Sequence, residues 1–141
     1  MPTLTTKQLW DAHPYPASPC DTTYFVNQCA IRMSVALRGA GADLGSFIGA
    51  KCYPSLKHSP RHALRAQELA DWLATQTTLV GTVQKFKAVT HADFVGKKGI
   101  VFIKDGWGPT DHIDIWDGEA LKGGSPDYFA RGKAVWFWEL T

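Results

Sequence analysis

The sequence lacks the features that mark several common classes of protein. No run of apolar residues approaches the about 20 that a membrane-spanning helix needs, so we expect no membrane partner. The 15 basic and 13 acidic residues are interleaved, give a net charge of +2, and form no basic stripe of the kind that follows a phosphate backbone. Nucleic acid is therefore not an expected partner. The N-terminus has no basic start, long apolar run or cleavage site, which predicts no signal peptide and synthesis in the cytoplasm.

Cysteine is scarce. The three cysteines are Cys20, Cys29 and Cys52, and no C-x-x-C pair occurs. This excludes a disulfide scaffold and argues against a zinc knuckle, and at least one thiol stays outside any disulfide. The glycine-rich motifs that cradle phosphates are absent too, and we expect neither a cofactor nor a metal.

The sequence does contain enough apolar residues, 45% of 141, for one buried core, and we expect a single domain over residues 1–141. Helical patterns come first and strand-like runs follow, which predicts an α+β fold with the helices packed on one face of an antiparallel meander. The stretch 77–83 has strand-like composition without a clear period. Helices are expected within 1–12 (capped by Thr5 or Thr6), from the cap Asn27 to Gly39–Gly41, from Ser59-Pro60 to about Ala74 and at 91–95 (capped by Thr90), and strands at 99–104, 112–116 and 134–138.

Cys29 falls in the first turn of the second predicted helix. The free N–H groups and the helix dipole stabilise negative charge there, which favours a reactive thiolate. The competing interpretation is a small buried apolar residue, the commonest fate of a free cysteine.

A thiolate nucleophile needs a base within hydrogen-bond reach, and His112 is the best candidate because it begins a strand after a glycine- and proline-rich loop. It shares a strand face with Asp114 and Trp116. His112 could instead be a half-exposed strand residue, or a metal ligand together with Asp114 and Asp117. Three other histidines, His13, His58 and His62, are expected at the surface.

The six tryptophans are many for this length. Trp136 and Trp138 share one face of the last strand, and Trp116 is expected to join them across the sheet. Such a surface could bind a sugar, as in a non-enzymatic binding module, but core or groove wall is the simpler interpretation.

Two longer strings resemble a known family. NQCAIRMS at residues 27–34 is similar to the nucleophile helix of the type VI secretion amidase effectors, family four, and DHIDIWDG at residues 111–118 is similar to their histidine strand. LRAQELADWL at 64–73, GIVF at 99–102 and WFW at 136–138 add to a resemblance that spans about residues 24–138.

The resemblance implies a papain-like fold of the NlpC/P60 kind and a cysteine peptidase of peptidoglycan that cuts between γ-D-glutamate and meso-diaminopimelate. Cys29 would be the nucleophile and His112 the general base and acid, with the Cys29 backbone N–H and the Gln28 side chain as oxyanion donors. The third member should lie about a hairpin beyond the histidine, where Gly123 and Gly124 stand. Asp127 is the nearest acidic residue and the one we favour, with Asp114 as the alternative.

The resemblance also implies export by the type VI secretion apparatus, action in the periplasm of the target cell, and a cognate immunity protein that blocks the groove. A same-fold amidase that cuts the D-alanine–diaminopimelate cross-link is the alternative within this class. In an oxidising periplasm Cys20 and Cys52 could pair as a disulfide.

Overall fold

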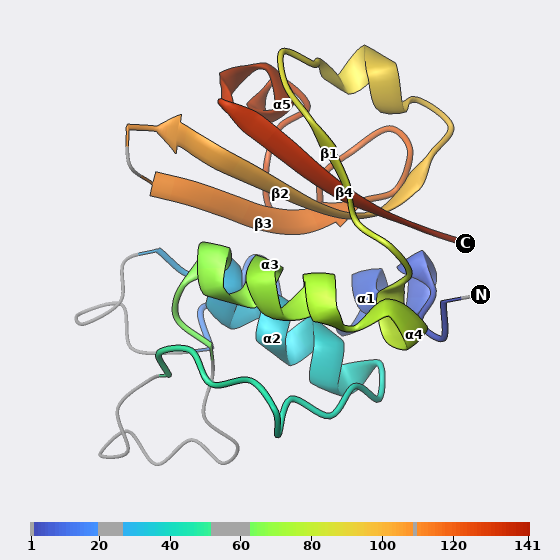
Figure 1. The fold of residues 1–141 in the computed structure, drawn as a ribbon, viewed down its shortest axis with the longest axis vertical. Coiled ribbons are helices and arrows are strands. Elements are labelled where there is room, and N and C mark those ends of the chain that lie inside the picture. The colour runs from blue at the N-terminus through green and yellow to red at the C-terminus, as the bar shows by residue number, and fades with distance from the viewer. Residues whose placement is uncertain (1, 20–26, 52–62, 109) are drawn as a thin grey trace.

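The computed structural model places three helices against one face of a four-stranded antiparallel sheet (Figure 1). It describes residues 2–19, 27–51, 63–108 and 110–141. The elements are α1 (Thr6–Ala12), α2 (Cys29–Gly39), α3 (Ala66–Thr75), α4 (Thr77–Val80), β1 (Gln84–Phe86), the 3-10 helix η2 (His91–Phe94), β2 (Lys98–Trp107), β3 (Thr110–Trp116), α5 (Tyr128–Arg131) and β4 (Ala134–Leu140).

The strand order is β1-β4-β2-β3, so the predicted meander is wrong in its last step. β2 and β3 form a hairpin, but β4 pairs with β2 on the far side of that hairpin, with Phe102 opposite Trp136. β2 therefore has a neighbour on each side, and β3 is left at the edge of the sheet. This places the histidine strand where a helix end can reach it.

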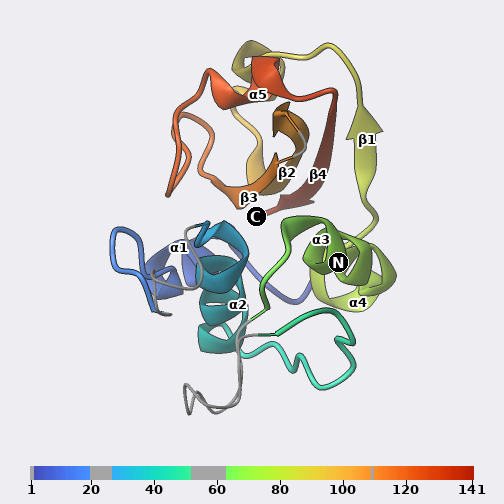
Figure 2. The ribbon, with the colours of Figure 1, turned by 90° about the vertical axis from the view of Figure 1, so that its left-hand side faces the viewer.

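Both faces of the sheet are covered, because successive side chains of a strand point to opposite faces. Ile100 and Phe102 pack with α1, α2 and α3, whereas Val101 and Ile103 pack with η2 and α5 on the other face. Figure 2 shows the three long helices on one side of the sheet and α5 on the other. The expectation that helices cover one face holds for the long helices only.

The first two helices begin close to where the sequence predicts. Thr5 caps α1, and its side chain and that of Gln8 form a reciprocal capping box. The N-cap of α2 is Gln28 rather than Asn27, although the Asn27 side chain still accepts a hydrogen bond from the N–H of Cys29 at 3.2 Å. α2 ends at the predicted glycines, with Gly41 in the left-handed region at φ 99°.

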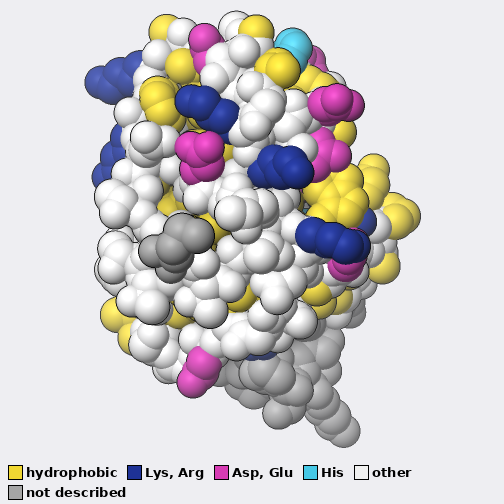
Figure 3. Space-filling view, turned by 90° about the vertical axis from the view of Figure 1, so that its right-hand side faces the viewer, with side chains coloured by type: hydrophobic (Ala, Val, Ile, Leu, Met, Phe, Trp, Pro, Cys, Tyr) yellow, Lys and Arg dark blue, Asp and Glu magenta, His cyan; other side chains and the backbone are white. Residues whose placement is uncertain are grey.

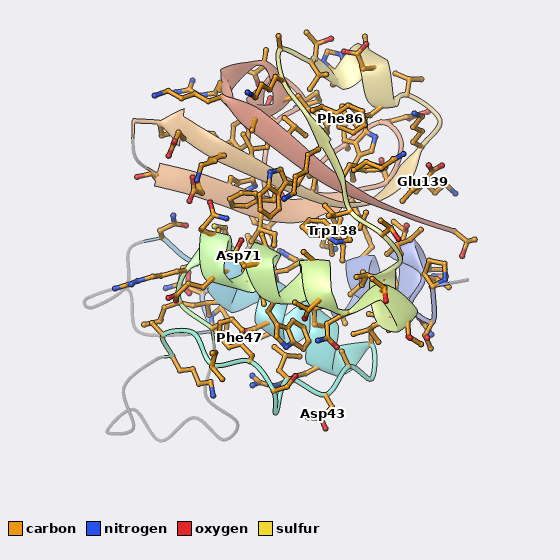
Figure 4. The ribbon with its side chains drawn as sticks, in the orientation of Figure 1. Asp43, Phe47, Asp71, Phe86, Trp138 and Glu139 are labelled. Carbon is orange, nitrogen blue, oxygen red and sulfur yellow. The ribbon has the colours of Figure 1, made fainter. Side chains whose placement is uncertain are left out.

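The third helix begins later than predicted. The expected start at Ser59 lies outside the described residues, but Leu64 and Arg65 are not helical and α3 begins at Ala66. Its apolar stripe packs into the core, and Trp72 also meets Phe47 edge to face beyond the helix (Figure 4). Its C-terminal end agrees with the prediction within one residue.

Three short elements were missed or mistaken in the sequence. In the stretch 77–83, whose composition is strand-like, Thr77–Val80 form the helix α4 and residues 81–83 are in neither helix nor strand. The next strand, β1, is only three residues long. α5 has no matching prediction. The turn capped by Thr90 is confirmed as η2, with a capping box to Asp93.

The tryptophans belong to the core rather than to one platform. Trp138 is buried between the sheet and the helices (Figure 4), and Trp116 is buried on the opposite face, so the expectation that they join is wrong. Trp136 is half-buried and is covered by Lys85, whose Nζ lies 4.0 Å from the ring centroid.

The two chain ends meet at one end of the molecule (Figure 1). The N–H of Thr6 donates to the carbonyl of Thr141 at 2.9 Å, and the N–H of Leu4 donates to the carbonyl of Leu79. Figure 3 views this side and shows basic and acidic side chains interspersed. No helix in the described part of the chain is long and apolar enough to cross a membrane.

Candidate active site

The start of α2 lies against the edge strand β3, and this contact brings Cys29 to His112. Both elements begin at the left-hand side of Figure 1, away from the chain ends. Cys29 is buried, with 6% of its surface exposed, and its Sγ lies 3.8 Å from the carbonyl oxygen of Asp111. Its side chain is also close enough to that of His112 to raise the pKa of the imidazole. The predicted helix-borne thiol and strand-borne imidazole are therefore together.

Asp114 is the carboxylate that contacts His112. Its Oδ2 lies 2.8 Å from Nε2 of the ring, and the two side chains are 1% and 13% exposed. Since Nε2 faces Asp114, Nδ1 is the ring nitrogen left to serve the thiol of Cys29. This is the arrangement in which a carboxylate orients an imidazole and stabilises its charged form.

Backbone amides hold the Asp114 carboxylate in place. Oδ1 accepts a hydrogen bond from the N–H of Ile115 at 2.8 Å, and both oxygens accept from the N–H of Gly123, at 3.1 and 2.9 Å. Such bonds satisfy the carboxylate oxygens, which are buried away from solvent. Asp114 therefore contacts both His112 and the loop at Gly123, and it lies on the same strand as the histidine.

The charge state of His112 follows from these contacts. Burial lowers its pKa, but the hydrogen bonds and negative charges of Asp114 and Cys29 raise it, and the balance raises the pKa of His112 from 6.5 to about 9. The ring therefore carries a positive charge at neutral pH.

Asp127 lies elsewhere. It is exposed, occupies the N-cap position of α5 without a capping hydrogen bond from its side chain, and accepts a hydrogen bond from the hydroxyl of Ser125. No hydrogen bond or ion pair between described residues joins it to His112. Of the two sequence candidates for the third member, the structure places Asp114 on the histidine and Asp127 in a surface turn.

The proposed oxyanion donors lie at the helix start. The N–H of Cys29 donates to Oδ1 of Asn27 at 3.2 Å, so an oxyanion would have to take the place of that amide oxygen. Gln28 is buried beside the nucleophile, and its carbonyl accepts from Arg32 in the first turn of α2.

A pocket of about 390 Å³ opens beside the nucleophile. It lies between Asn27, the start of α3 and the start of β3, and two of its lining residues, Asn27 and Asp111, contact Cys29. Its lining residues are Asn27, Leu64, Arg65, Ala66, Gln67, Glu68, Thr110 and Asp111.

The metal interpretation needs the Asp117 carboxylate as a third ligand, but that carboxylate is engaged in its own turn. Asp117 is exposed, and its carboxylate accepts from the N–H groups of Glu119 and Ala120 in the following turn. No group of three or more His, Cys, Asp or Glu side chains within the described ranges is arranged to hold a metal ion.

The sequence missed two features near the site. His13, expected at the surface, is buried at the end of α1, while His58 and His62 lie outside the described residues. Trp107 and Tyr128 form an aromatic group with His112. The three residues lie on different elements, so no local sequence pattern predicts this contact.

The surroundings of His13 keep it neutral. Burial, and to a smaller extent the charges of Lys122, Arg32 and His112, lower the pKa of His13 from 6.5 to about 4 although Asp114 acts to raise it. Its Nδ1 accepts a hydrogen bond from the N–H of Tyr15 at 3.2 Å, which a protonated ring could not do.

Comparison with known proteins gives a family and a fold. The family model of type VI secretion system amidase effector protein 4 matches residues 25–138. The type VI effector–immunity complex Tae4–Tai4 from Salmonella Typhimurium contains a similar chain, with a TM-score of 0.75 and 21% identity over 98% of this chain and 99% of that one. The same complex from Enterobacter cloacae gives 0.74 and 23% over 98% and 99%. The effector alone from Enterobacter cloacae gives 0.73 and 22% over 98% and 97%.

These likenesses confirm the papain-like fold of the NlpC/P60 kind. A comparison with curated protein sequences gives no match.

Proposed function

The chain belongs to the family of type VI secretion system amidase effector protein 4, and on that premise we propose that it is a cysteine amidase that cuts the bond between γ-D-glutamate and meso-diaminopimelate in peptidoglycan stem peptides. The observation that carries the mechanism is the chain of contacts from Cys29 through His112 to Asp114. The amidase activity is that of the family, and the choice of bond rests on the resemblance of residues 27–34 and 111–118 to its motifs.

The proposed reaction is acyl transfer through a thioester. The Cys29 proton resides on His112, and the thiolate attacks the carbonyl carbon of the scissile amide. The tetrahedral intermediate collapses, the C–N bond breaks, and His112 gives its proton to the leaving amine. The neutral imidazole then takes a proton from water, which attacks the thioester, breaks the C–S bond, and releases the acid and the thiolate of Cys29 beside the protonated His112. Asp114 stabilises His112 in its charged form at each stage.

The negative charge of the tetrahedral intermediate needs donors. The N–H of Cys29 is one, because the oxyanion can replace the Asn27 side chain as its acceptor. The Gln28 side chain is the second candidate. A donor of this kind is worth about 10²–10³ in kcat where it has been removed from other hydrolases.

The test is digestion of purified stem peptides by the wild type and by Cys29→Ala, with the products read by mass spectrometry. New termini at γ-D-glutamate and diaminopimelate, absent with the variant, are expected. Products cut at the D-alanine–diaminopimelate cross-link would show the alternative bond. No cleavage by freshly reduced wild type would contradict the proposal and favour another acyl substrate or a binding module.

From its family we also propose that this chain is exported by type VI secretion and acts in the periplasm of a target cell. The related effectors are seen in complex with the immunity protein Tai4, and a cognate immunity protein would block the groove beside Cys29. Expression directed to the periplasm should lyse cells, whereas the same chain kept in the cytoplasm should not. Equal toxicity in both compartments would contradict a cell-wall target.

A further inference from the structure

The imidazole of His112 is held by more than its hydrogen bonds. Its ring centroid lies 5.1 Å from that of Tyr128 with the planes at 89°, and 5.8 Å from that of Trp107 with the planes at 65°. The two aromatic rings also contact each other, at 4.8 Å and 80°. Three rings from β2, β3 and α5 therefore meet at close to right angles, the geometry that aromatic pairs prefer.

This aromatic group is itself anchored. The guanidinium of Arg131 lies 5.0 Å from the centroid of Trp107, and its Nε donates to the carbonyl of Gly106 at 3.2 Å. On the other side, Asp111 accepts a hydrogen bond from the N–H of Asp105 at 2.7 Å and so fixes the irregular end of the hairpin that carries Trp107.

The Tyr128 ring fits against the hairpin loop because residue 124 is a glycine. A Cβ on Gly124 would lie 2.5 Å from Cε2 of Tyr128 and 3.2 Å from Nε2 of His112. A side chain there would push the two rings out of place. The hairpin loop thus approaches the histidine closely enough for the Tyr128 ring to pack against it.

We propose that Tyr128 is a positioning residue, whose ring holds the imidazole of His112 in the orientation that serves Asp114 and Cys29 at the same time. A hydrogen bond to Asp114 fixes one nitrogen but allows the ring to swing about it. Tyr128 and Trp107 block that swing and keep water from the His112–Asp114 pair, where a lower dielectric strengthens the attraction. The charged groups that act on His112 are Asp114 and Cys29, against the effect of its burial.

The inference rests on the proposed function for its kinetic readout, but a second readout needs no peptidoglycan. The rate at which iodoacetamide alkylates Cys29, followed on the peptide that contains it, reports the thiolate directly. If the wild type cuts no stem peptide but the alkylation rates separate the variants, the proposed substrate fails and the role of Tyr128 stands.

The variants are Tyr128→Ala, Tyr128→Leu, which fills the space without a ring, and Tyr128→Phe, which keeps the ring. The matched control is Phe86→Ala. Phe86 on β1 (Figure 4) is also half-buried against the same cluster and meets the buried Phe94 edge to face at 5.3 Å and 88°, away from the site.

We expect Tyr128→Ala and Tyr128→Leu to lower kcat and the alkylation rate by about tenfold, the size of one good aromatic contact, with KM within about twofold. Tyr128→Phe should restore both rates to within about twofold of wild type. Phe86→Ala should lower the Tm by about as much as Tyr128→Ala does, but should leave kcat and the alkylation rate within about twofold of wild type.

Three results would overturn the proposal. The first is that Tyr128→Ala and Tyr128→Leu keep wild-type rates. The second is that Phe86→Ala slows the reactions as much as Tyr128→Ala, which would mean a general loosening. The third is that Tyr128→Phe does not restore the rates, which would assign the effect to the hydroxyl group.

Discussion

The carboxylate of Asp114 lies 2.8 Å from the imidazole of His112, two residues earlier on the same strand face. The third catalytic group that we propose is therefore carried by the histidine strand, and the hairpin beyond it contributes only the backbone N–H of Gly123. A side chain at the next turn, Asp127, faces solvent instead.

This relationship predicts a ranking of two substitutions. Asp114→Asn should lower kcat/KM by about 10³-fold, because the amide cannot stabilise the imidazolium and favours the wrong tautomer. Asp127→Asn should leave kcat/KM within about twofold, since an exposed turn residue touches none of the reacting groups. Steady-state kinetics on stem peptides decides between them, and the opposite ranking would restore Asp127 as the third member.

The pH dependence of catalysis should have a limb set by His112. Its pKa is raised to about 9, so the imidazolium that protonates the leaving amine is present at neutral pH and is lost as pH rises through about 9. The rate should fall above that value and should not fall between pH 6 and 8. Asp114→Asn should move this limb to lower pH; a limb that stays in place would mean that Asp114 does not stabilise the charged ring.

The stability of the fold should pass through a maximum near pH 6.5, because the two buried histidines act in opposite directions. The raised pKa of His112 gives a stabilisation that is full below about 6.5 and is lost as pH rises through about 9. The lowered pKa of His13 means that the unfolded chain binds a proton between about 6.5 and 4 when the folded chain does not, so acid destabilises the fold in that window.

The acid limb is separable by substitution. His13→Gln should lose the part of the acid destabilisation that His13 causes, up to about 3 kcal/mol at full effect. Urea denaturation of both chains at several pH values measures it. The same decrease in stability between pH 6.5 and 4 in the variant would assign the effect to other groups.

The hairpin loop should tolerate no side chain at Gly124. Gly124→Ala would place a Cβ 2.5 Å from the Tyr128 ring, and we expect kcat to fall by about tenfold as the ring shifts. A Cβ on Gly106, also half-buried near the site, meets no atom closer than 3.4 Å. Gly106→Ala is therefore the control, and equal losses in the two variants would contradict this prediction.

Local patterns predicted the long elements and the pair Cys29–His112. Caps, glycine stops and strand alternation depend on neighbours in the sequence, so α1, α2, β3 and β4 were predicted close to their observed bounds. The order of the strands is not local. β4 passes β3 to pair with β2, where the two strands bury Phe102 and Trp136 against each other, and nothing within either strand records that choice.

The proposed third catalytic group, Asp114, is a second contact that local sequence patterns could not fully predict. The family resemblance pointed to Asp127, the acidic residue nearest to the position expected about a hairpin beyond the histidine. The contact with His112 depends instead on which face of β3 a side chain occupies and on where the loop at Gly123 returns. Strand alternation had already placed Asp114 on the face of His112, and this was the signal with a physical basis. The burial of His13 depends on the packing of α1 against the rest of the chain, which its neighbours in sequence do not determine.

The meeting of the chain ends, through the hydrogen bond between Thr6 and Thr141, has a consequence for protein engineering. A short linker can join the ends, and new ends can be opened at an exposed turn such as that of Asp117 and Glu119. Reporter domains or affinity tags fused at the existing ends would lie away from the start of α2, which carries Cys29.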